Sequence, residues 1–98
     1  MNITKTVNDK TITLAVSGRI DTLTAVDFEK EIDSAVAQAQ ELILDMKELE
    51  YTSSAGLRVI LKAQKMMNNK GKMKLINVSE DVREIFDITG FLDILTIE

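Results

Sequence analysis

The fold is decided by residues 41–61, which read ELILDMKELEYTSSAGLRVIL. The segment starts with the apolar run Leu42–Leu44 between charged residues, which is typical of a short central strand buried on both faces of a parallel sheet. It continues through three consecutive hydroxyl residues, Thr52–Ser54, into apolar residues at helical spacing, which predicts a helix beginning near Ser54. A strand that leads into a helix in this way indicates a βαβ unit and hence an α/β fold.

The residues before this unit predict an antiparallel hairpin. Residues 2–7 and 11–17 alternate between apolar and polar side chains, the pattern of strands with one buried face. The turn is expected at residues 8–10, where Asn8 tolerates the left-handed backbone that a tight turn can require. Gly18 is expected to end the second strand.

Three amphipathic helices are expected, each with a hydroxyl residue at its start. They are predicted from Thr24 to about Gln40, from Ser54 to about Lys70, and from Ser79 to about Gly90. Gly71 is expected to supply a left-handed C-cap to the second helix, and Gly90 to close the third. Short strands at 73–76 and 94–97 complete a largely parallel, mixed sheet of four or five strands with the hairpin at its start.

Composition limits the chemistry. The 98 residues suffice for one domain, 1–98, and include no His, Cys, Trp or Pro. An imidazole base, a thiolate nucleophile and the usual zinc ligands are therefore excluded. The segment around Ser54 also lacks the Gly-x-Ser-x-Gly pattern of a nucleophile elbow. We therefore expect no enzyme, no metal and no cofactor, and a small hydrolase is the least favoured class.

Charge and hydropathy narrow the choice of partners. No apolar run is long enough for a membrane span, and the N-terminus lacks a secretion signal, so a cytoplasmic protein is expected. The net charge of −4 argues against direct nucleic-acid binding. Six of the twelve basic residues lie between Arg58 and Lys74 without any acid, whereas the rest of the chain carries six basic and 16 acidic residues. This basic segment is either a solvated helix face or a surface for an anion or a partner.

The hydroxyls that precede the second helix have two interpretations. Open α/β sheets gather their sites at the carboxyl ends of strands, where helix N-termini favour anions. Ser54 is either a helix N-cap or a phosphorylation site, and the small residues Ala55 and Gly56 leave its hydroxyl accessible. One turn later, Arg58 can pair with a phosphate or with a nearby Glu.

Three other positions near this point are candidates for the site. Asp21 follows a strand and is either a plain turn residue or a neighbour of the hydroxyls. Leu23 and Leu57 are the nearest apolar residues and are candidates for a docking patch.

Three stretches together resemble one family. Leu44-Asp45 followed by residues 49–61 resembles the signature of STAS domains of the anti-sigma factor antagonist type, the bacterial anti-anti-sigma factors. Residues 18–21 resemble the Gly-x-Leu-Asp loop of that family, and residues 82–91 its last helix and closing turn. The resemblance covers nearly the whole chain and implies the STAS fold.

The resemblance also implies a switch. It places the phosphoacceptor on Ser54, with Ser53 as the weaker candidate and Asp21 close by. The remaining positions near the acceptor are Thr52, Gly56, Leu57 and Arg58. The unphosphorylated protein would bind an anti-sigma factor that is also a serine kinase and so release a sigma factor. Phosphorylation would end the binding, and a serine phosphatase would restore it.

This chain departs from the family pattern at two positions. Ser53 stands where many relatives carry Asp, and Ala55 where they carry Ser or Thr. The alternative to the switch is a non-switching STAS scaffold or accessory subunit of a signalling or lipid-transport complex, in which Ser54 is only a cap.

Overall fold

The N-terminal hairpin forms where the alternation predicts it, but only its second strand has the expected buried face, because the first is exposed apart from partly buried Ile3. In the computed structural model, which describes residues 1–98, β1 (Asn2–Asn8) pairs antiparallel with β2 (Thr11–Ile20). The turn residue with a left-handed backbone is Asp9, with φ 56°, so the expectation for Asn8 was wrong. Asp tolerates this conformation for the same reason as Asn, because its short polar side chain bonds to nearby backbone.

The second strand continues past Gly18, contrary to the expected end at that residue. Gly18 has φ 84°, and the pairing register shifts between Gly18 and Arg19, so the glycine forms a bulge inside β2. Before the bulge, β2 pairs in parallel with β3 (Glu41–Asp45), and after it with β4 (Leu49–Thr52). β4 was not expected from the sequence, because its four residues show no alternation of buried and exposed positions.

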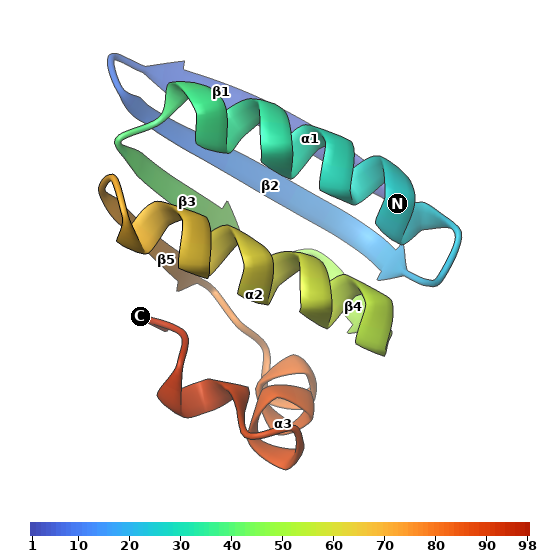
Figure 1. Ribbon diagram of the computed structural model, residues 1–98. Helices are drawn as coiled ribbons and strands as arrows, with labels where there is room; N and C mark the ends of the chain where they lie inside the picture. Colours follow the sequence, from blue (N-terminus) through green and yellow to red (C-terminus); the bar gives the residue numbers. More distant parts are fainter.

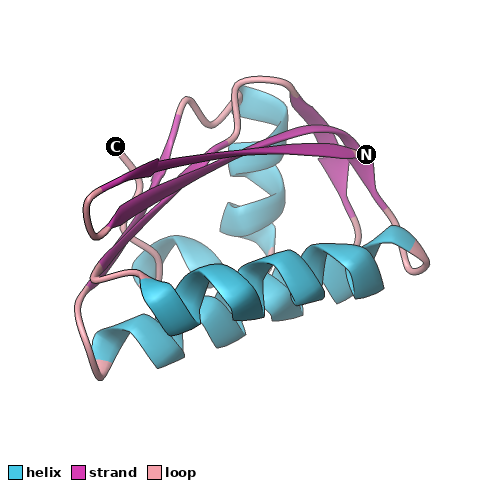
Figure 2. Ribbon diagram, turned by 90° about the horizontal axis from the view of Figure 1, so that it is seen from above, coloured by secondary structure: helices cyan, strands magenta, loops and turns pink.

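The sheet has the strand order β1-β2-β3-β5, where β5 is Lys72–Ile76 and β4 pairs with β2 off this path. α1 (Thr24–Gln38) and α2 (Ser54–Asn68) lie side by side along one face of the sheet (Figures 1 and 2). Leu42 and Leu44 are fully buried towards these helices, whereas Ile43 between them is only partly buried. Burial of this strand on both faces was therefore a wrong expectation: the helices cover one face only.

The C-terminal part differs from its prediction in one element. α3 (Glu80–Ile88) is capped by Ser79, as expected, and Gly90 follows it with φ 78°. A 3-10 turn, η1 (Phe91–Asp93), comes next, and the expected last strand is reduced to one bridge between Leu75 and Ile97.

Gly71 is not a left-handed cap. α2 ends in a right-handed residue, Asn69, and Gly71 does not have positive φ. Its role is close approach, because a Cβ at Gly71 would lie 1.9 Å from the carbonyl oxygen of Gln40.

The core is a single cluster of 24 buried apolar residues between the sheet and the helices. No helix combines the length and hydropathy required to cross a bilayer.

Candidate functional site

The site lies where two adjacent parallel strands end. β2 and β4 are paired through Ile20 and Thr52, and the Ser53 N–H donates to the Ile20 carbonyl oxygen over 2.8 Å. The chain then leaves β2 into α1 and β4 into α2, so both helices begin at the same edge of the sheet (Figure 1). Asp21 and the Ser53–Ser54 pair, distant in sequence, are therefore brought together.

Ser53, and not Ser54, caps α2. The Ser53 side chain accepts a hydrogen bond from the Gly56 N–H at 3.4 Å, and the Ser53 carbonyl accepts one from Leu57 N–H at 3.1 Å. Ser54 is the first helical residue, is exposed, and takes no part in the cap. Its hydroxyl is thus available at a helix N-terminus, where the first N–H groups lack intrahelical acceptors.

Two of the residues around Ser54 have a structural role. Thr52 is 2% exposed, and its hydroxyl donates to the Ser53 carbonyl oxygen over 3.2 Å. Gly56 is also buried, and a Cβ there would lie 2.2 Å from Thr52 Oγ1. Gly56 therefore lets the first turn of α2 press against β4 and β2, which fixes the position of Ser54.

Asp21 caps the first turn of α1 from outside the helix. Its carboxylate accepts from the N–H groups of Leu23 (2.9 Å) and Thr24 (2.8 Å), and the Asp21 N–H donates to Thr24 Oγ1 over 2.8 Å. The hydrogen bonds from Thr24 are the main cause of a lowered pKa at Asp21, which keeps the carboxylate ionised. Thr24 is not the N-cap that was expected. The N-cap position is Leu23, whose side chain makes no cap bond.

A shallow groove of about 310 Å³ runs between the first turns of α1 and α2. Val26 and Ala55 line it, and exposed Leu23 lies nearby at the start of α1. Leu23 is 82% exposed and Val26 56%, so two apolar side chains are exposed here, beside a groove that Glu29, Arg58 and Lys62 also line. Leu57 is only 3% exposed and belongs to the core, so its expected place in a docking patch was wrong.

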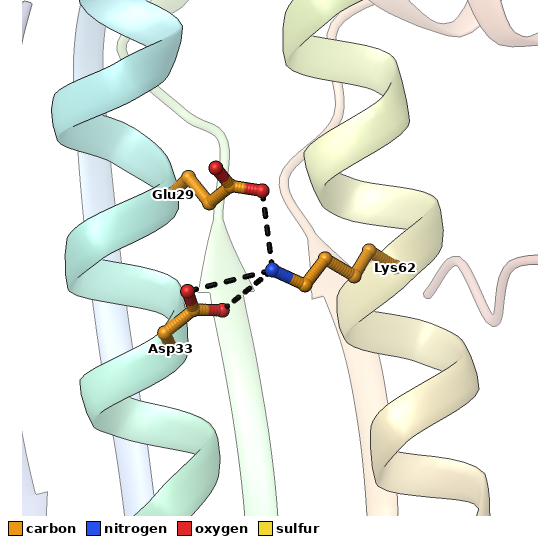
Figure 3. Close-up of polar contacts among 3 residues, drawn as sticks. All are labelled: Glu29, Asp33 and Lys62. Carbon is orange, nitrogen blue, oxygen red and sulfur yellow. Dashed lines mark hydrogen bonds and ion pairs between the residues drawn. The ribbon is translucent and has the colours of Figure 1, made fainter.

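The basic segment is not one continuous free surface. Lys62 on α2 bridges two acids of α1, with Nζ 3.1 Å from Glu29 and 3.2 Å from Asp33 (Figure 3). These hydrogen bonds, with that of Glu29 the largest, raise the pKa of Lys62. Lys70 donates to the Val36 carbonyl oxygen.

Of the remaining basic residues, one is paired and three are free of ion pairs. Lys74 pairs with Glu98 at 3.6 Å. Arg58, Lys65 and Lys72 make no ion pair, and Arg58 is the one that lines the groove beside Ala55. The free positive charge nearest to Ser54 in the helix is therefore that of Arg58, one turn further on.

One feature of this edge was not found by sequence reasoning. The guanidinium of Arg19 lies over the ring of Tyr51, 4.5 Å from its centroid. The two residues are register partners on β2 and β4, and Tyr51 is 37% exposed. If β4 had been recognised as a strand, these two residues would have been placed side by side. The sequence of β4 indicates a strand only weakly, because Leu49 and Thr52 are its only buried residues.

The reactive group that this arrangement exposes is the hydroxyl of Ser54. The chain contains no His or Cys, and no group of three or more Asp or Glu side chains could hold a metal. Around Ser54 lie the N-terminus of α2, the Arg58 side chain and a groove lined by both apolar and charged residues.

Comparisons with known proteins agree with this geometry. A family model described as STAS domain matches residues 2–98. The chain is 32% identical to the anti-sigma-B factor antagonist of Bacillus subtilis over 98 residues, covering 99% of this chain and 90% of that protein. The anti-sigma factor antagonist SpoIIAA in its unphosphorylated form superposes with a TM-score of 0.83 at 19% identity, covering 99% of this chain and 88% of that one.

The Bacillus SpoIIAA structure in the phosphorylated form superposes with a TM-score of 0.77 at 18% identity, covering 99% of this chain and 91% of that one. At these identities the structural matches establish the fold. The family resemblance and the mixed-sheet STAS fold inferred from the sequence are confirmed.

Proposed function

This chain belongs to the STAS domain family, and we propose that it is an anti-sigma factor antagonist that works by partner switching through Ser54. The unmodified protein binds an anti-sigma factor that is also a serine kinase, and a sigma factor is released. The kinase phosphorylates Ser54, which ends the binding, and a serine phosphatase restores it. The observation that carries the proposal is the cap by Ser53, which leaves the Ser54 hydroxyl exposed.

A phosphate at Ser54 fits the local structure without refolding. The N–H groups of Ser54 and Ala55 have no acceptor in the helix, and the helix dipole favours an anion at this end. Arg58 follows at i+4 on the same face and makes no ion pair that a phosphate would have to displace. The modification therefore changes the charge of the surface far more than its shape.

The same phosphate opposes binding of the partner. The exposed side chains of Leu23 and Val26 lie on the α1 side of the acceptor, next to a groove lined in equal part by apolar residues and by polar or charged ones. A phosphate adds about 1.5 to 2 negative charges there, which a docked partner would have to desolvate. A hundredfold loss of affinity needs only about 3 kcal/mol, so repulsion and desolvation suffice.

The non-switching scaffold is less well supported, because it gives Ser54 the role of the cap. That role belongs to Ser53, and an exposed serine beyond the cap has no structural task in α2.

The test combines phosphorylation with binding. Four proteins are incubated with the kinase-type anti-sigma factor and ATP: wild type, Ser54→Ala, Ser53→Ala and, as a matched control, Ser34→Ala on the exposed surface of α1. Mass spectrometry should find one phosphate on wild type, Ser53→Ala and Ser34→Ala and none on Ser54→Ala. Binding of the anti-sigma factor, measured by calorimetry, should be at least about a hundredfold weaker for the phosphorylated protein.

Two results would contradict the switch. One is a phosphate on Ser53, or no phosphate, in the presence of an active kinase. The other is equal affinity of the modified and unmodified proteins for the anti-sigma factor.

A further inference from the structure

The outer face of α2 carries a second feature besides Ser54. α1 and α2 form a layer on one side of the sheet, and nothing in the chain covers the outside of that layer (Figure 2). Four charged or apolar side chains on this face of α2 are exposed, and one between them is half-buried. We call these five residues the α2 stripe: Arg58, Leu61, Lys62, Lys65 and Met66.

The α2 stripe carries positive charge without any acid. The 15 residues of α2 include one Arg and two Lys but neither Asp nor Glu, whereas α1 and α3 each carry four acids and one base. Exposed helix faces are commonly stabilised by Glu–Lys pairs four residues apart, and α2 has no such pair. α2 is therefore a basic helix in a chain with a net charge of −4.

Two of the three charges in the α2 stripe are uncompensated. Lys62 is bonded to two acids of α1 (Figure 3). Arg58 and Lys65 make no ion pair. They are seven residues apart, or about 10 Å along the helix axis. Two free charges of one sign at this spacing attract an acidic surface over about one Debye length, roughly 8 Å at physiological salt.

A hollow of about 370 Å³ lies among these side chains. Its lining consists of the five residues of the α2 stripe and no others. Leu61 and Met66 are its apolar part, and Met66 is 36% exposed. Methionine side chains adapt to different partners and are frequent at docking surfaces. An apolar hollow between bases fits an apolar side chain that has acids on either side of it.

The hollow is continuous with the surface beside Ser54. Arg58 and Lys62 line both the hollow and the groove between the first turns of α1 and α2. Lys65 follows Ser54 by 11 residues, or about 16 Å along the helix. An interface of standard size buries about 800 Å² on each partner, equivalent to a disc about 32 Å across. One partner can therefore cover Ser54 and the whole α2 stripe together.

We propose that the α2 stripe is the docking surface for the anti-sigma factor, which places an apolar side chain flanked by Asp or Glu in the hollow between Arg58 and Lys65. This inference rests on the proposed function and adds the chemistry by which the partner is recognised. Charge complementarity raises the association rate and rejects partners of the wrong charge. A phosphate on Ser54 that pairs with Arg58 also removes one of the two free charges of the stripe.

The test compares two charge reversals in binding to the kinase-type anti-sigma factor, measured by surface plasmon resonance with the full chain. Lys65→Glu reverses a charge of the stripe. Lys72→Glu is the matched control, because Lys72 is equally exposed and unpaired. It precedes buried Met73 in β5, so its side chain points to the face of the sheet that the helices leave uncovered.

Lys65→Glu should weaken binding at least about tenfold, mainly through slower association, whereas Lys72→Glu should change it less than about twofold. The difference between the two variants should shrink at high salt. Met66→Gln keeps the length of the side chain and should weaken binding about three- to tenfold, as expected for one lost apolar contact. Its control is Val7→Thr at an exposed position of β1, which should leave binding unchanged. Circular dichroism checks that each variant is folded.

The outcomes separate this inference from the switch. If phosphorylation weakens wild-type binding but Lys65→Glu binds like wild type, or loses no more than Lys72→Glu, the docking surface is refuted and the switch at Ser54 stands. If unmodified wild type does not bind the anti-sigma factor, both proposals fail. Self-association of the protein alone that Lys65→Glu abolishes in analytical ultracentrifugation would assign the stripe to a second copy of this chain, and would also overturn the proposal.

Discussion

Gly56→Ala tests whether close contact fixes the beginning of α2. An added Cβ would lie 2.2 Å from Thr52 Oγ1 and 2.8 Å from Ile20 Cγ2, and both partners are buried β-branched side chains with little freedom to move. Overpacking of this kind costs about 3 kcal/mol, at the upper end of its usual range. Alanine gains about 1 kcal/mol of helix propensity over glycine. We therefore expect a net loss of about 2 kcal/mol in the free energy of unfolding.

The assay is urea unfolding followed by far-ultraviolet circular dichroism. Lys65→Ala and Lys65→Gly, at an exposed position of the same helix, measure the propensity difference in this protein. Thr52→Ala combined with Gly56→Ala removes the nearer contact and should show a coupling of at least about 1 kcal/mol in the double-mutant cycle. A Gly56→Ala variant at least as stable as wild type would refute the contact argument, because propensity alone would then explain the result.

Three further outcomes follow from the site and the core. Ser53→Ala should lose about 1 kcal/mol of unfolding free energy because the cap is lost. Ser54→Ala should stay within about 0.5 kcal/mol of wild type. Equal losses for the two variants in urea unfolding would mean that Ser54 shares the cap. Asp21 has a lowered pKa in the folded protein, so its stabilising effect is present above its unfolded pKa of about 3.9 and lost as the pH falls through the folded value. The stability difference between wild type and Asp21→Asn should therefore be constant from pH 5 to 7 and shrink at pH 3, and a difference that grows on acidification would contradict this sign. Gly71→Ala should destabilise by at least about 2 kcal/mol in thermal or urea unfolding, because its Cβ would strike the Gln40 carbonyl oxygen.

The sequence predicted those elements whose signal is periodic and local. The hairpin, α1, α2 and α3 have alternating or helical spacing over seven or more residues, and all are confirmed. β4 was missed because its pairing is non-local: it depends on a bulge at Gly18 that lets β2 change partners. The glycine at 71 was recognised as special for the wrong reason, since its contact with Gln40 is visible only in three dimensions.

For the site, the sequence predicted the region correctly. It did not predict which of the three hydroxyl residues is buried, which caps the helix and which is exposed. Three adjacent hydroxyls at a helix start have similar propensities, so local rules could not decide which one caps. The structure assigns Thr52 to the core and Ser53 to the cap, and leaves Ser54 exposed. Thr24 was misassigned for a related reason: Asp21, three residues earlier, accepts from the N–H groups of Leu23 and Thr24, so the helical turn is already capped before Thr24.

The proposed switch depends on how firmly its acceptor is held. The Ser53 N–H is bonded to Ile20 in β2, Gly56 lies close to Thr52 and Ile20, and Leu57 is anchored in the core, so the backbone around Ser54 is held at three points. We therefore expect a phosphate there to act where it is attached, at the exposed start of α2. Modification and binding then compete for one surface, and the size of the switch is set by how deeply the partner buries Ser54.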